Sequence, residues 1–529
     1  MSDMKTVNII GAGLAGLSAA ITLARAGVNS NLISSQVSER AQSVLAEGGI
    51  NASLDTMGEQ DTTAEHFADT MKGGCFLASK RAVDGLTENA PSIVKELAAL
   101  GVPFNAQNGR LILRNFGGQK KKRTAHAKSS TGKIIMTALI DEARKYEAER
   151  LIRRFPNHEL TGMDVQDNAL VSVTVQDSRS KKCLRFTGPT ILCTGGLNGF
   201  FEGMTTGTTQ NTGNAAAIAF CAGAELANLE FIQYHPTTVS ITGKRMLISE
   251  AARGEGGRLF IMRNDKPWYF MEEKYPELGN LMPRDVVSRE MTAVVSMPEC
   301  TGSVMLDLTG LSAEVWSGKL SDLRAEIMPY MNIDPKLIPV PVSPGIHYFM
   351  GGIRVDIRHE TSVKKLYGAG EAACQYHGAN RLGGNSMLGA LYGGKTAALS
   401  ALEAAEKVRI GTVPTNAETS LPNNRTRLCR VLASGLGIIR NEETLKSAVR
   451  EIDALICDNA LNEIDRSRTR LGKAMLLSAL ARKESRGAHT RSDYPRTSAD
   501  FQKTTVAGLH NGEVMIRFAA IDESEGSPK

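Results

Sequence analysis

Short apolar runs alternate with helical patterns from the beginning of the chain. The run TVNII at residues 6–10 is apolar and β-branched, which is typical of a buried strand. The next residues, GAGLAG, lead into LSAAITLARAG, whose apolar positions recur at helical spacing and which closes at Gly27. The following run, NSNLISS, again has the composition of a strand. This order predicts a strand–helix–strand unit.

The rest of the chain divides into regions of different pattern. A helix-rich region at about residues 61–101 and a polar, basic loop at residues 116–132 precede another helical stretch, TGKIIMTALIDEARKY. The runs LVSVTVQD and LRFTGPTILCTGG are β-rich, and KKLYGAG is again a strand followed by glycine. Residues of about 235–345 carry scattered Pro, Trp and charges, and we interpret them as an inserted domain. From about residue 420 the pattern is helical and charged.

The composition is that of a globular protein. The chain has 529 residues, 42% hydrophobic and 22% charged, so it can bury the cores of two or three domains. Its net charge of +6 is small for this length and does not by itself indicate a nucleic-acid partner. The run Lys120–Arg123 is basic, but no aromatic residues are interleaved with it to stack on bases. We therefore expect a solvated loop or a partner surface there, and no nucleic-acid partner.

The cysteines and the hydropathy bear on metals and on location. The eight cysteines, from Cys75 to Cys457, are scattered, and none forms the CxxC or CxH spacing of a metal site. We therefore expect no metal and no iron–sulfur cluster held by this chain alone. Scattered thiols fit a cytoplasmic protein. The sequence shows no signal-peptide layout and no apolar run near the roughly 20 residues of a membrane helix, so we expect membrane contact only through partners.

The glycines after the first strand form a dinucleotide-binding fingerprint. Gly11, Gly13 and Gly16 give GxGxxG between the predicted strand and helix, where the glycines permit a tight turn and let a pyrophosphate approach the helix N-terminus. The acid that would hold a ribose about 20 residues further on is absent, and Ser34 and Ser35 stand at the end of the second strand. This departure weakens an NAD interpretation and leaves FAD open.

Nine stretches then carry a resemblance over nearly the whole chain, in one order from residue 7 to about 495. They are AEGGINASL, RNFGGQKKKRTAHAKSSTG, FIQYHPTT, ISEAARGEGGRL, PRDVVSR, HYFMGGI, YGAGEAA, HGANRLGGNS and SALARKESRGAH. Together with the fingerprint, they resemble the flavoprotein subunits of succinate dehydrogenase and fumarate reductase, with their relative L-aspartate oxidase. The resemblance implies an FAD-dependent enzyme that interconverts fumarate and succinate.

The resemblance also implies the fold and its domains. We expect an α/β protein with a doubly wound, Rossmann-like FAD-binding domain, an inserted α+β capping domain and a C-terminal helical domain. Their expected ranges are residues 1–232 with 349–410, residues 233–348, and residues 411–529. In this family, FAD lies extended and the dicarboxylate lies between the flavin and the cap.

The resemblance implies three catalytic residues, namely a proton donor and the two residues of a relay that resupplies its proton. Arg284, in PRDVVSR, matches the family's proton-donating arginine. Arginine is an unusual acid because its pKa is above about 12, so its proton must move in concert with the reaction and be replaced. Glu250 and Arg253, in SEAARGEGG, match the family's proton relay, and their spacing of three lets both face the same way on one turn.

Further residues match substrate and flavin contacts. His235 and His347 match histidines that bind the substrate carboxylates, and Arg381 matches the arginine whose planar fork clamps one carboxylate. We also expect Ser249 to add a hydroxyl donor. The resemblance assigns flavin contacts to Gly11, Ala12, Gly13, Leu14, Gly16, Ser43, Gly48, Gly49, Glu371, Arg381, Ser386 and Leu388. Asn214 joins this set, although it stands in TGNA where the family often has the aspartate of TGDG.

Two departures discriminate within the family. Gln42, in RAQS, stands where membrane-complex enzymes often have a histidine, in RSHT, that bonds covalently to FAD. Gln42 cannot form that bond, so we expect noncovalent FAD and a lower flavin potential, which favours fumarate reduction. Phe116 stands where L-aspartate oxidases usually have a glutamate that contacts the substrate amine. We therefore count Phe116 among the substrate residues and favour a plain C4 dicarboxylate.

The electron partner and some alternatives stay open at this stage. Because the chain has no cluster-binding cysteine pattern, we expect electrons from a separate iron–sulfur subunit, with the protein cytoplasmic or peripheral at the inner face of a membrane through its partners. A stand-alone reductase with a small reduced donor is one alternative. L-aspartate oxidase, which makes iminoaspartate for NAD synthesis, and a reductase of another enoate are others. The intact set of charged residues argues against a noncatalytic FAD scaffold and a flavin-dependent RNA-modifying protein.

Overall fold

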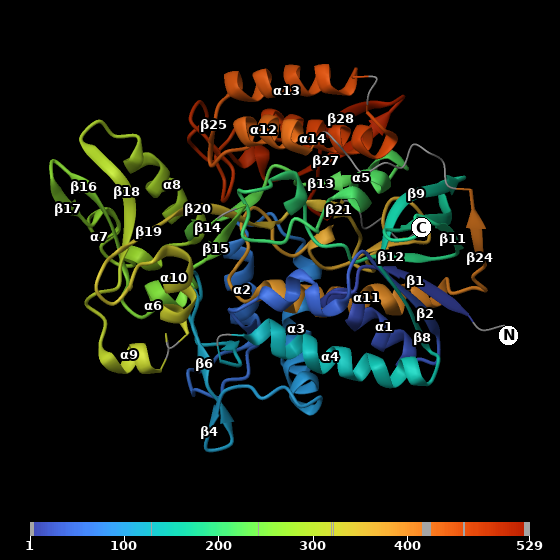
Figure 1. Ribbon diagram of the computed structural model, residues 1–529, viewed down its shortest axis with the longest axis horizontal. Coiled ribbons are helices and arrows are strands. Elements are labelled where there is room, and N and C mark those ends of the chain that lie inside the picture. Colours follow the sequence, from blue (N-terminus) through green and yellow to red (C-terminus); the bar gives the residue numbers. More distant parts are fainter. Residues whose placement is uncertain are drawn as a thin grey trace.

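A five-stranded parallel sheet forms the centre of the molecule (Figure 1). The computed structural model describes residues 5–128, 130–241, 243–318, 320, 322–414, 425–458 and 461–522. The strand order is β22 (Leu366–Gly368), β12 (Thr190–Leu192), β1 (Thr6–Ile10), β2 (Asn29–Ser34) and β8 (Ile152–Pro156). Each neighbouring pair is parallel. Because β1 and β2 are parallel and joined through α1 (Leu14–Arg25), the predicted strand–helix–strand unit is confirmed.

Both faces of this sheet are covered, because successive residues of each strand point to opposite sides. On one side, Ile9 and Ile191 pack in a core with α1 and the helices around it. These helices are α2 (Thr63–Gly73), α3 (Lys80–Ala99), α4 (Thr131–Ala148) and α11 (Asn385–Glu403). On the other side, Ile10 and Leu192 pack in a second core with a four-stranded antiparallel sheet and α5 (Asn214–Cys221).

The antiparallel sheet is ordered β24 (Ile410–Val413), β11 (Cys183–Thr187), β10 (Ala169–Asp177) and β9 (His158–Gln166). Strand β24 pairs with β11, and thus spans the boundary that we predicted between residues 410 and 411. The division of the chain into domains stays a prediction, and parts of its ranges, residues 1–4, 415–424, 459–460 and 523–529 among them, lie outside the described residues.

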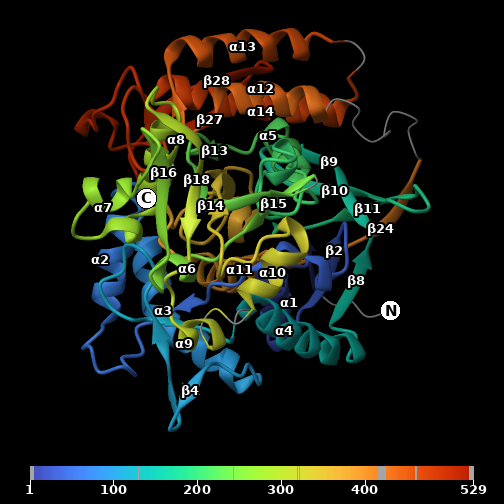
Figure 2. The ribbon, with the colours of Figure 1, turned by 60° about the vertical axis from the view of Figure 1, so that its left-hand side comes forward.

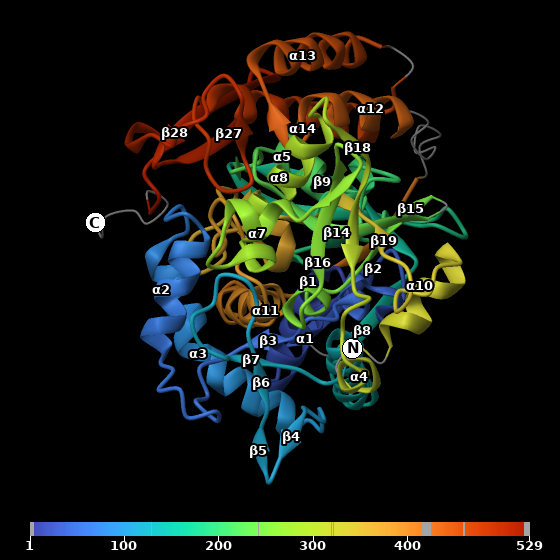
Figure 3. The same ribbon diagram turned by 90° about the vertical axis from the view of Figure 1, so that its left-hand side faces the viewer.

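The inserted region forms a separate body against the parallel-sheet region, and it faces the viewer in Figure 3. It contains the sheet β17 (Lys266–Trp268), β16 (Arg258–Arg263), β18 (Cys300–Asp307) and β19 (Val340–Pro341). The helices around it are α6 (Ala251–Gly254), α7 (Phe270–Lys274), α8 (Arg284–Val295), α9 (Ala313–Ser317) and α10 (Leu323–Met331). A core of its own, which includes Ile261, Leu306 and Ile327, holds the two layers together. This is the α+β cap that the sequence predicts.

The cap is joined to the rest of the molecule by one three-stranded sheet. Its strands are β15 (Lys244–Leu247), β14 (Ile232–Ile241) and β20 (Ser343–Phe349). Strand β14 enters the cap and β20 leaves it, and the two pair antiparallel. The predicted substrate residues His235 and His347, which these two strands carry, are therefore held on one sheet at the junction.

The C-terminal region is helical first and then adds a hairpin. Helices α12 (Arg425–Gly435), α13 (Glu442–Ile456) and α14 (Glu463–Ala481) form the layer at the top of Figure 1. After them, β27 (Thr504–His510) and β28 (Glu513–Ala519) pair and extend a sheet that contains β13 (Leu226–Ala227), β21 (Gly352–Arg354) and β23 (Ala373–Cys374). The predicted helices are confirmed, and the strands, which the sequence pattern did not predict there, dock the chain end on the central region.

Buried arginines fasten this layer to the core. Arg482 is fully buried, and its Nε donates to Glu230 Oε1 over 2.6 Å while its Nη1 donates to Glu484 Oε1 over 3.0 Å. Arg440, also buried, donates from Nη1 to the backbone oxygen of Glu230 over 2.8 Å. A buried guanidinium is costly unless it is paired and hydrogen-bonded, so these contacts fix one relative position of the parts.

Among the helices formed by the described residues, none is long and apolar enough to cross a membrane. The same part of the chain contains no group of three His, Cys, Asp or Glu side chains that could hold a metal ion.

Candidate active site

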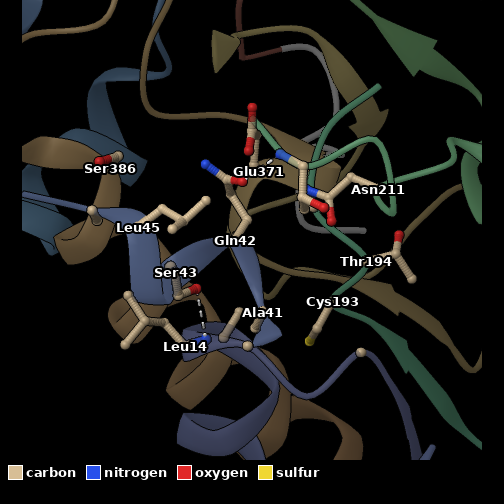
Figure 4. Close-up of a pocket in the computed structure, with 18 of the residues that line it drawn as sticks. Leu14, Ala41, Gln42, Ser43, Leu45, Cys193, Thr194, Asn211, Glu371 and Ser386 are labelled. Carbon is tan, nitrogen blue, oxygen red and sulfur yellow. Dashed lines mark hydrogen bonds between the residues drawn. The ribbon is translucent and has the colours of Figure 1, made fainter. Parts of the chain in front are cut away.

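A cavity of about 260 Å³ lies between the parallel-sheet region and the cap. Its wall begins at the end of β2 with Ser34, passes the turn after β1, and reaches Arg284 of the cap. Figure 4 shows side chains that enter it from several elements, with Leu45 and Ser386 on one side and Thr194 and Asn211 on the other. The cavity is therefore continuous from the fingerprint turn to the predicted catalytic residues.

The fingerprint glycines are required by backbone contacts. Gly11 has φ +111°, and a Cβ there would lie 2.1 Å from the carbonyl oxygen of Cys193. A Cβ on Gly16 would lie 1.9 Å from the carbonyl oxygen of Gly11. Gly13 caps α1 without a side-chain bond, and Leu14 N donates to Ser43 Oγ over 3.2 Å (Figure 4). The helix N-terminus thus faces the cavity, where a helix end favours a phosphate group.

A second helix, α11, also begins at the cavity. Gly384 has φ +82°, and a Cβ there would lie 2.1 Å from Asn51 Oδ1, so only glycine fits before the first turn. Of the two flavin contacts predicted on this helix, Ser386 lines the cavity, whereas Leu388 does not and is fully buried in the core. Gly16 likewise serves helix packing and is not part of the wall. The flavin contacts of all the residues predicted to make them stay predictions.

Glu371 and Gln42 also lie on the wall of the cavity (Figure 4). Glu371 Oε1 accepts a hydrogen bond from Phe349 N over 3.0 Å, and burial raises the pKa of this carboxyl to about 7. Gln42 Oε1 accepts from Thr208 N over 2.6 Å, which joins two loops across the cavity. The side chain of Gln42 is thereby held by the protein and offers no imidazole to a flavin.

The remaining predicted flavin residues are also on the wall. Gly48, Gly49 and Asn214 line the cavity, and a Cβ on Gly48 would lie 3.1 Å from Cζ of the buried Phe116. The wall thus offers a helix N-terminus for a pyrophosphate and small residues that let a flat ring approach. These residues fit FAD.

The three catalytic candidates form one chain of charged groups. Arg284 donates from Nε and Nη2 to Glu250 Oε2 over 2.9 and 2.8 Å. Behind them, Arg253 Nη2 lies 3.8 Å from Glu250 Oε1, and Gly117 N donates to the same oxygen over 3.1 Å. Burial opposes the charge of Glu250, but the two arginines outweigh it and hold its pKa at about 2. Arg284 and Glu250 line the cavity, whereas Arg253 lies behind them.

Gln233 belongs to the site, although the sequence motifs do not single it out. It is fully buried, and its Oε1 accepts from Arg284 Nη1 over 3.3 Å and from Arg381 Nη2 over 2.9 Å. Its Nε2 donates to Asn380 Oδ1 over 2.8 Å and to the backbone oxygen of Arg381 over 2.9 Å. The amide therefore holds the two arginines side by side. Its place in FIQYHPTT, two residues before His235, is the signal that could have pointed to it.

His235 and His347 are brought together from β14 and β20. Their ring centroids are 5.3 Å apart, and both rings line the cavity. Thr206 Oγ1 and His347 Nδ1 are within hydrogen-bond distance, at 2.9 Å. Burial, followed by the charge of Arg284, lowers the pKa of both histidines well below the ordinary value. Both are therefore neutral at physiological pH, and each can donate one N–H to an anion.

Arg381 and Ser249 complete the predicted substrate set, and both line the cavity. Arg381 is 4% exposed, and its Cζ lies 4.5 Å from the ring centroid of Tyr348. Burial lowers the pKa of its guanidinium to about 10, and among the described residues its Nε has no hydrogen-bond partner. A buried, incompletely paired guanidinium is a strong attractant for a carboxylate.

The basic run in the loop at residues 116–132 differs from expectation at one residue. Arg123 is fully buried, where its Nη2 lies 2.9 Å from Asp61 Oδ1 and its Nη1 lies 3.0 Å from Asp69 Oδ2. Lys121 Nζ donates to the backbone oxygen of Glu59 over 2.6 Å. The prediction of a solvated loop or partner surface is wrong for Arg123, because two acids from a distant segment pair with it.

The fold and this cavity define a flavin-dependent oxidoreductase. A family model described as an FAD binding domain matches residues 6–387, and one described as the fumarate reductase flavoprotein C-terminus matches residues 460–528. The chain is 34% identical to the succinate dehydrogenase flavoprotein subunit of Bacillus subtilis, over 96% of this chain and 94% of that one. It is 33% identical to the fumarate reductase flavoprotein subunit of Mycobacterium tuberculosis, over 94% of this chain and 93% of that one.

A solved structure agrees with these relatives. FrdA of the quinol fumarate reductase of E. coli superposes with a TM-score of 0.87 at 27% identity, over 99% of this chain and 98% of that one. The chain therefore belongs to the succinate dehydrogenase and fumarate reductase flavoprotein family, and its cofactor is FAD. None of these relatives bears the name L-aspartate oxidase, and that alternative gains no support.

Proposed function

We propose that this cavity interconverts fumarate and succinate, with Arg284 as the proton donor. The observation that carries the proposal is the chain Arg284–Glu250–Arg253, which meets His235 and Arg381 at one end of the cavity. Neutral imidazoles and guanidinium forks bind carboxylates, and a bound acid–base chain supplies a proton. Both needs of a dicarboxylate reductase are thus met by neighbouring side chains.

The chemistry divides between cofactor and protein. Reduced FAD supplies the hydride that one alkene carbon of fumarate accepts. Arg381, His235 and His347 hold the two carboxylates and stabilise the negative charge that develops on one of them. Arg284 donates the proton to the other carbon as the hydride arrives. Because Glu250 is ionised, it accepts a proton from Arg253 and passes it to Arg284, whose Nη2 lies 2.8 Å from Glu250 Oε2.

The favoured direction of the reaction follows from how FAD is attached to the protein. Gln42 stands where covalently flavinylated relatives carry histidine, and its side chain is engaged with Thr208 N. FAD is therefore held noncovalently, and the lower flavin potential that accompanies this favours fumarate reduction. Denaturation in acid should release all the flavin into the supernatant, and flavin that stays with the precipitate would contradict this step.

The electron route needs a partner. The two sequence relatives are named as subunits, and the cysteines among the described residues are free and scattered. A separate iron–sulfur subunit supplies or removes the electrons, and it also brings the protein to the inner face of a membrane, while this chain itself is cytoplasmic.

The experiment that tests the function is a comparison of Arg284→Ala with a matched arginine variant. Arg324→Ala removes an exposed cap arginine that pairs with Asp334. Fumarate reduction with reduced viologen, succinate oxidation with a dye, and L-aspartate oxidation with oxygen are measured on each purified protein. We expect fumarate reduction in the wild type and in Arg324→Ala, and none in Arg284→Ala although it retains FAD. Substantial fumarate turnover by Arg284→Ala would overturn the assignment, and activity on L-aspartate alone would overturn the substrate.

A further inference from the structure

Strand β2 contributes no acidic residue to the end of the cavity that lies beside it. In the dinucleotide-binding pattern, an acid at the end of the second strand accepts a hydrogen bond from a ribose hydroxyl. Here β2 ends at Ser34, whose Oγ donates to the backbone oxygen of Gln36 over 2.6 Å, and Ser35 follows. All three residues line the cavity. A carboxylate that accepts a hydrogen bond from the ribose hydroxyl must therefore come from another element of the fold.

Glu159 brings a carboxylate to the same end of the cavity from the adjoining strands. β8 runs parallel to β2, with Pro156 opposite Ser34. The chain then turns at Asn157, which has φ +62°, and enters β9, whose second residue is Glu159. Glu159 is half-buried and lines the cavity. The acid that β2 lacks is therefore present on a different strand at the same place.

The carboxylate of Glu159 is held through one of its two oxygens. Asn214 Nδ2 donates to Glu159 Oε1 over 2.7 Å, and Thr212 Oγ1 donates to the same atom over 3.1 Å. From the C-terminal layer, Arg468 Nη1 donates to Asn214 Oδ1 over 2.9 Å and fixes which way the amide points. Figure 2 shows α14, which carries Arg468, against α5, which begins with Asn214. Among the described residues no hydrogen bond reaches Glu159 Oε2, which is left for a ligand.

The amide at position 214 is what this arrangement needs. An aspartate there, as relatives often have, would bring two carboxylates to within about the 2.7 Å that now separates Asn214 Nδ2 from Glu159 Oε1. Two like charges so close cannot both stay ionised without a large cost. An amide, by contrast, donates a hydrogen bond to the carboxylate. Glu159 and Asn214 thus act as one unit, in which the strand supplies the acid and the helix supplies the amide.

We propose that Glu159, positioned by Asn214, binds the adenosine half of FAD by accepting a hydrogen bond from a ribose hydroxyl. The inference depends on FAD binding in this cavity and not on which dicarboxylate is the substrate. Because FMN lacks the adenosine half, comparing FAD with FMN separates this contact from a merely structural role of the carboxylate.

The first test is Glu159→Gln, which keeps the shape and an oxygen for Asn214 and Thr212 but removes the charge. Flavin-free protein is titrated with FAD and with FMN, followed by quenching of flavin fluorescence, and FAD release from the holoprotein is timed. FAD affinity should fall by about tenfold to a hundredfold, the range for losing one hydrogen bond to a charged group, while FMN affinity stays unchanged. Glu149→Gln, an exposed carboxylate beyond α4, is the matched control.

The second test exchanges the two groups. Asn214→Asp alone places two carboxylates next to each other, so it should lower the affinity for FAD at least as much as Glu159→Gln does. The double variant Asn214→Asp/Glu159→Gln restores one acid and one amide and should return FAD affinity to within about threefold of the wild type. The proposal is overturned if Glu159→Gln binds FAD as the wild type does, if it weakens FMN equally, or if the double variant binds no better than the weaker single variant. The wild-type titration measures FAD binding itself separately.

Discussion

Replacing Glu250 by glutamine tests the proton relay and the electrostatics of the site together. Against burial, Arg284 and Arg253 hold the pKa of Glu250 at about 2. The gap from the ordinary glutamate pKa of about 4.3 corresponds to about 3 kcal/mol of net attraction for the charged form. Glu250→Gln removes this attraction and leaves two guanidiniums facing a neutral amide. We therefore expect the free energy of unfolding to fall by about 3 kcal/mol.

The pH dependence of this loss has a definite sign. Because the pKa of Glu250 is lower in the folded protein, its stabilisation is fully present above about pH 4.3 and is lost only as the pH falls through about 2. The difference in unfolding free energy between wild type and Glu250→Gln should thus be constant from about pH 5 to about pH 9. Urea unfolding followed by tryptophan fluorescence at several pH values measures it. A difference that disappears within that range would contradict a carboxylate held ionised by its arginines.

The kinetic consequence of Glu250→Gln separates relay from binding. An amide cannot return a proton to Arg284, so kcat for fumarate reduction should fall by about 10² to 10⁴, the usual contribution of a positioned acid or base. Glu250 touches arginines and not the proposed carboxylate sites, and its removal makes the cavity more positive, so succinate binding, read from the flavin spectrum, should persist. Glu272→Gln, an exposed cap acid paired with Arg258, is the control. A kcat within about threefold of the wild type, or a loss of succinate binding, would refute this reasoning.

Three further predictions concern single side chains. Gln233→Leu removes the acceptor shared by two arginines, and since hydrogen bonds to charged groups contribute about 1.5–3 kcal/mol, KM for fumarate should rise at least about tenfold in steady-state assays; an unchanged KM would contradict the bridge. Arg123→Met leaves two buried aspartates unpaired and should cost about 3–5 kcal/mol in a denaturant titration, whereas the neighbouring, half-exposed Lys122→Met should cost less than about 1 kcal/mol. Burial raises the pKa of Glu371 to about 7, so in flavin-free protein its contribution to stability is lost as the pH rises from about 4.5 to about 7. Glu371→Gln should abolish that decline in the free energy of unfolding. If this variant keeps the wild-type pH profile, Glu371 is not the cause of the decline.

Much of the fold was predictable because local constraints already specify it. Only a glycine at position 16 lets the helix approach the carbonyl oxygen of Gly11 in the preceding turn, so the fingerprint could be recognised without the rest of the chain. The alternation of β1, with Ile9 and Ile10 in different cores, is likewise a property of a short segment. Features of this kind can be read from the spacing of residues within one short segment.

Other features depend on contacts between distant segments, and the spacing of residues within one segment does not indicate them. Arg123 belongs to a run of basic residues that looks solvated, and its burial follows from acids more than fifty residues earlier in the chain. Glu159 reaches the cavity only because β8 and β9 fold back beside β2. The sequence does not indicate the terminal hairpin, because charged helices precede it and β13, with which β27 pairs, lies far away in sequence.

The charges of the site indicate why a dianion completes it. Arg284, Arg253 and Arg381 are all buried or nearly so, while the pKa of His235 and of His347 is held low enough to keep both neutral. Within this cluster only Glu250 is negative, so two positive charges are left without a counter-charge. Burying them is costly, and burial has already lowered the pKa of Arg381 to about 10. Two carboxylates restore neutrality, whereas a monocarboxylate leaves one guanidinium unpaired. The site should therefore bind succinate much more tightly than butyrate, and a titration of the flavin spectrum that ranks the two equally would show that the charge of the ligand is not what these arginines select.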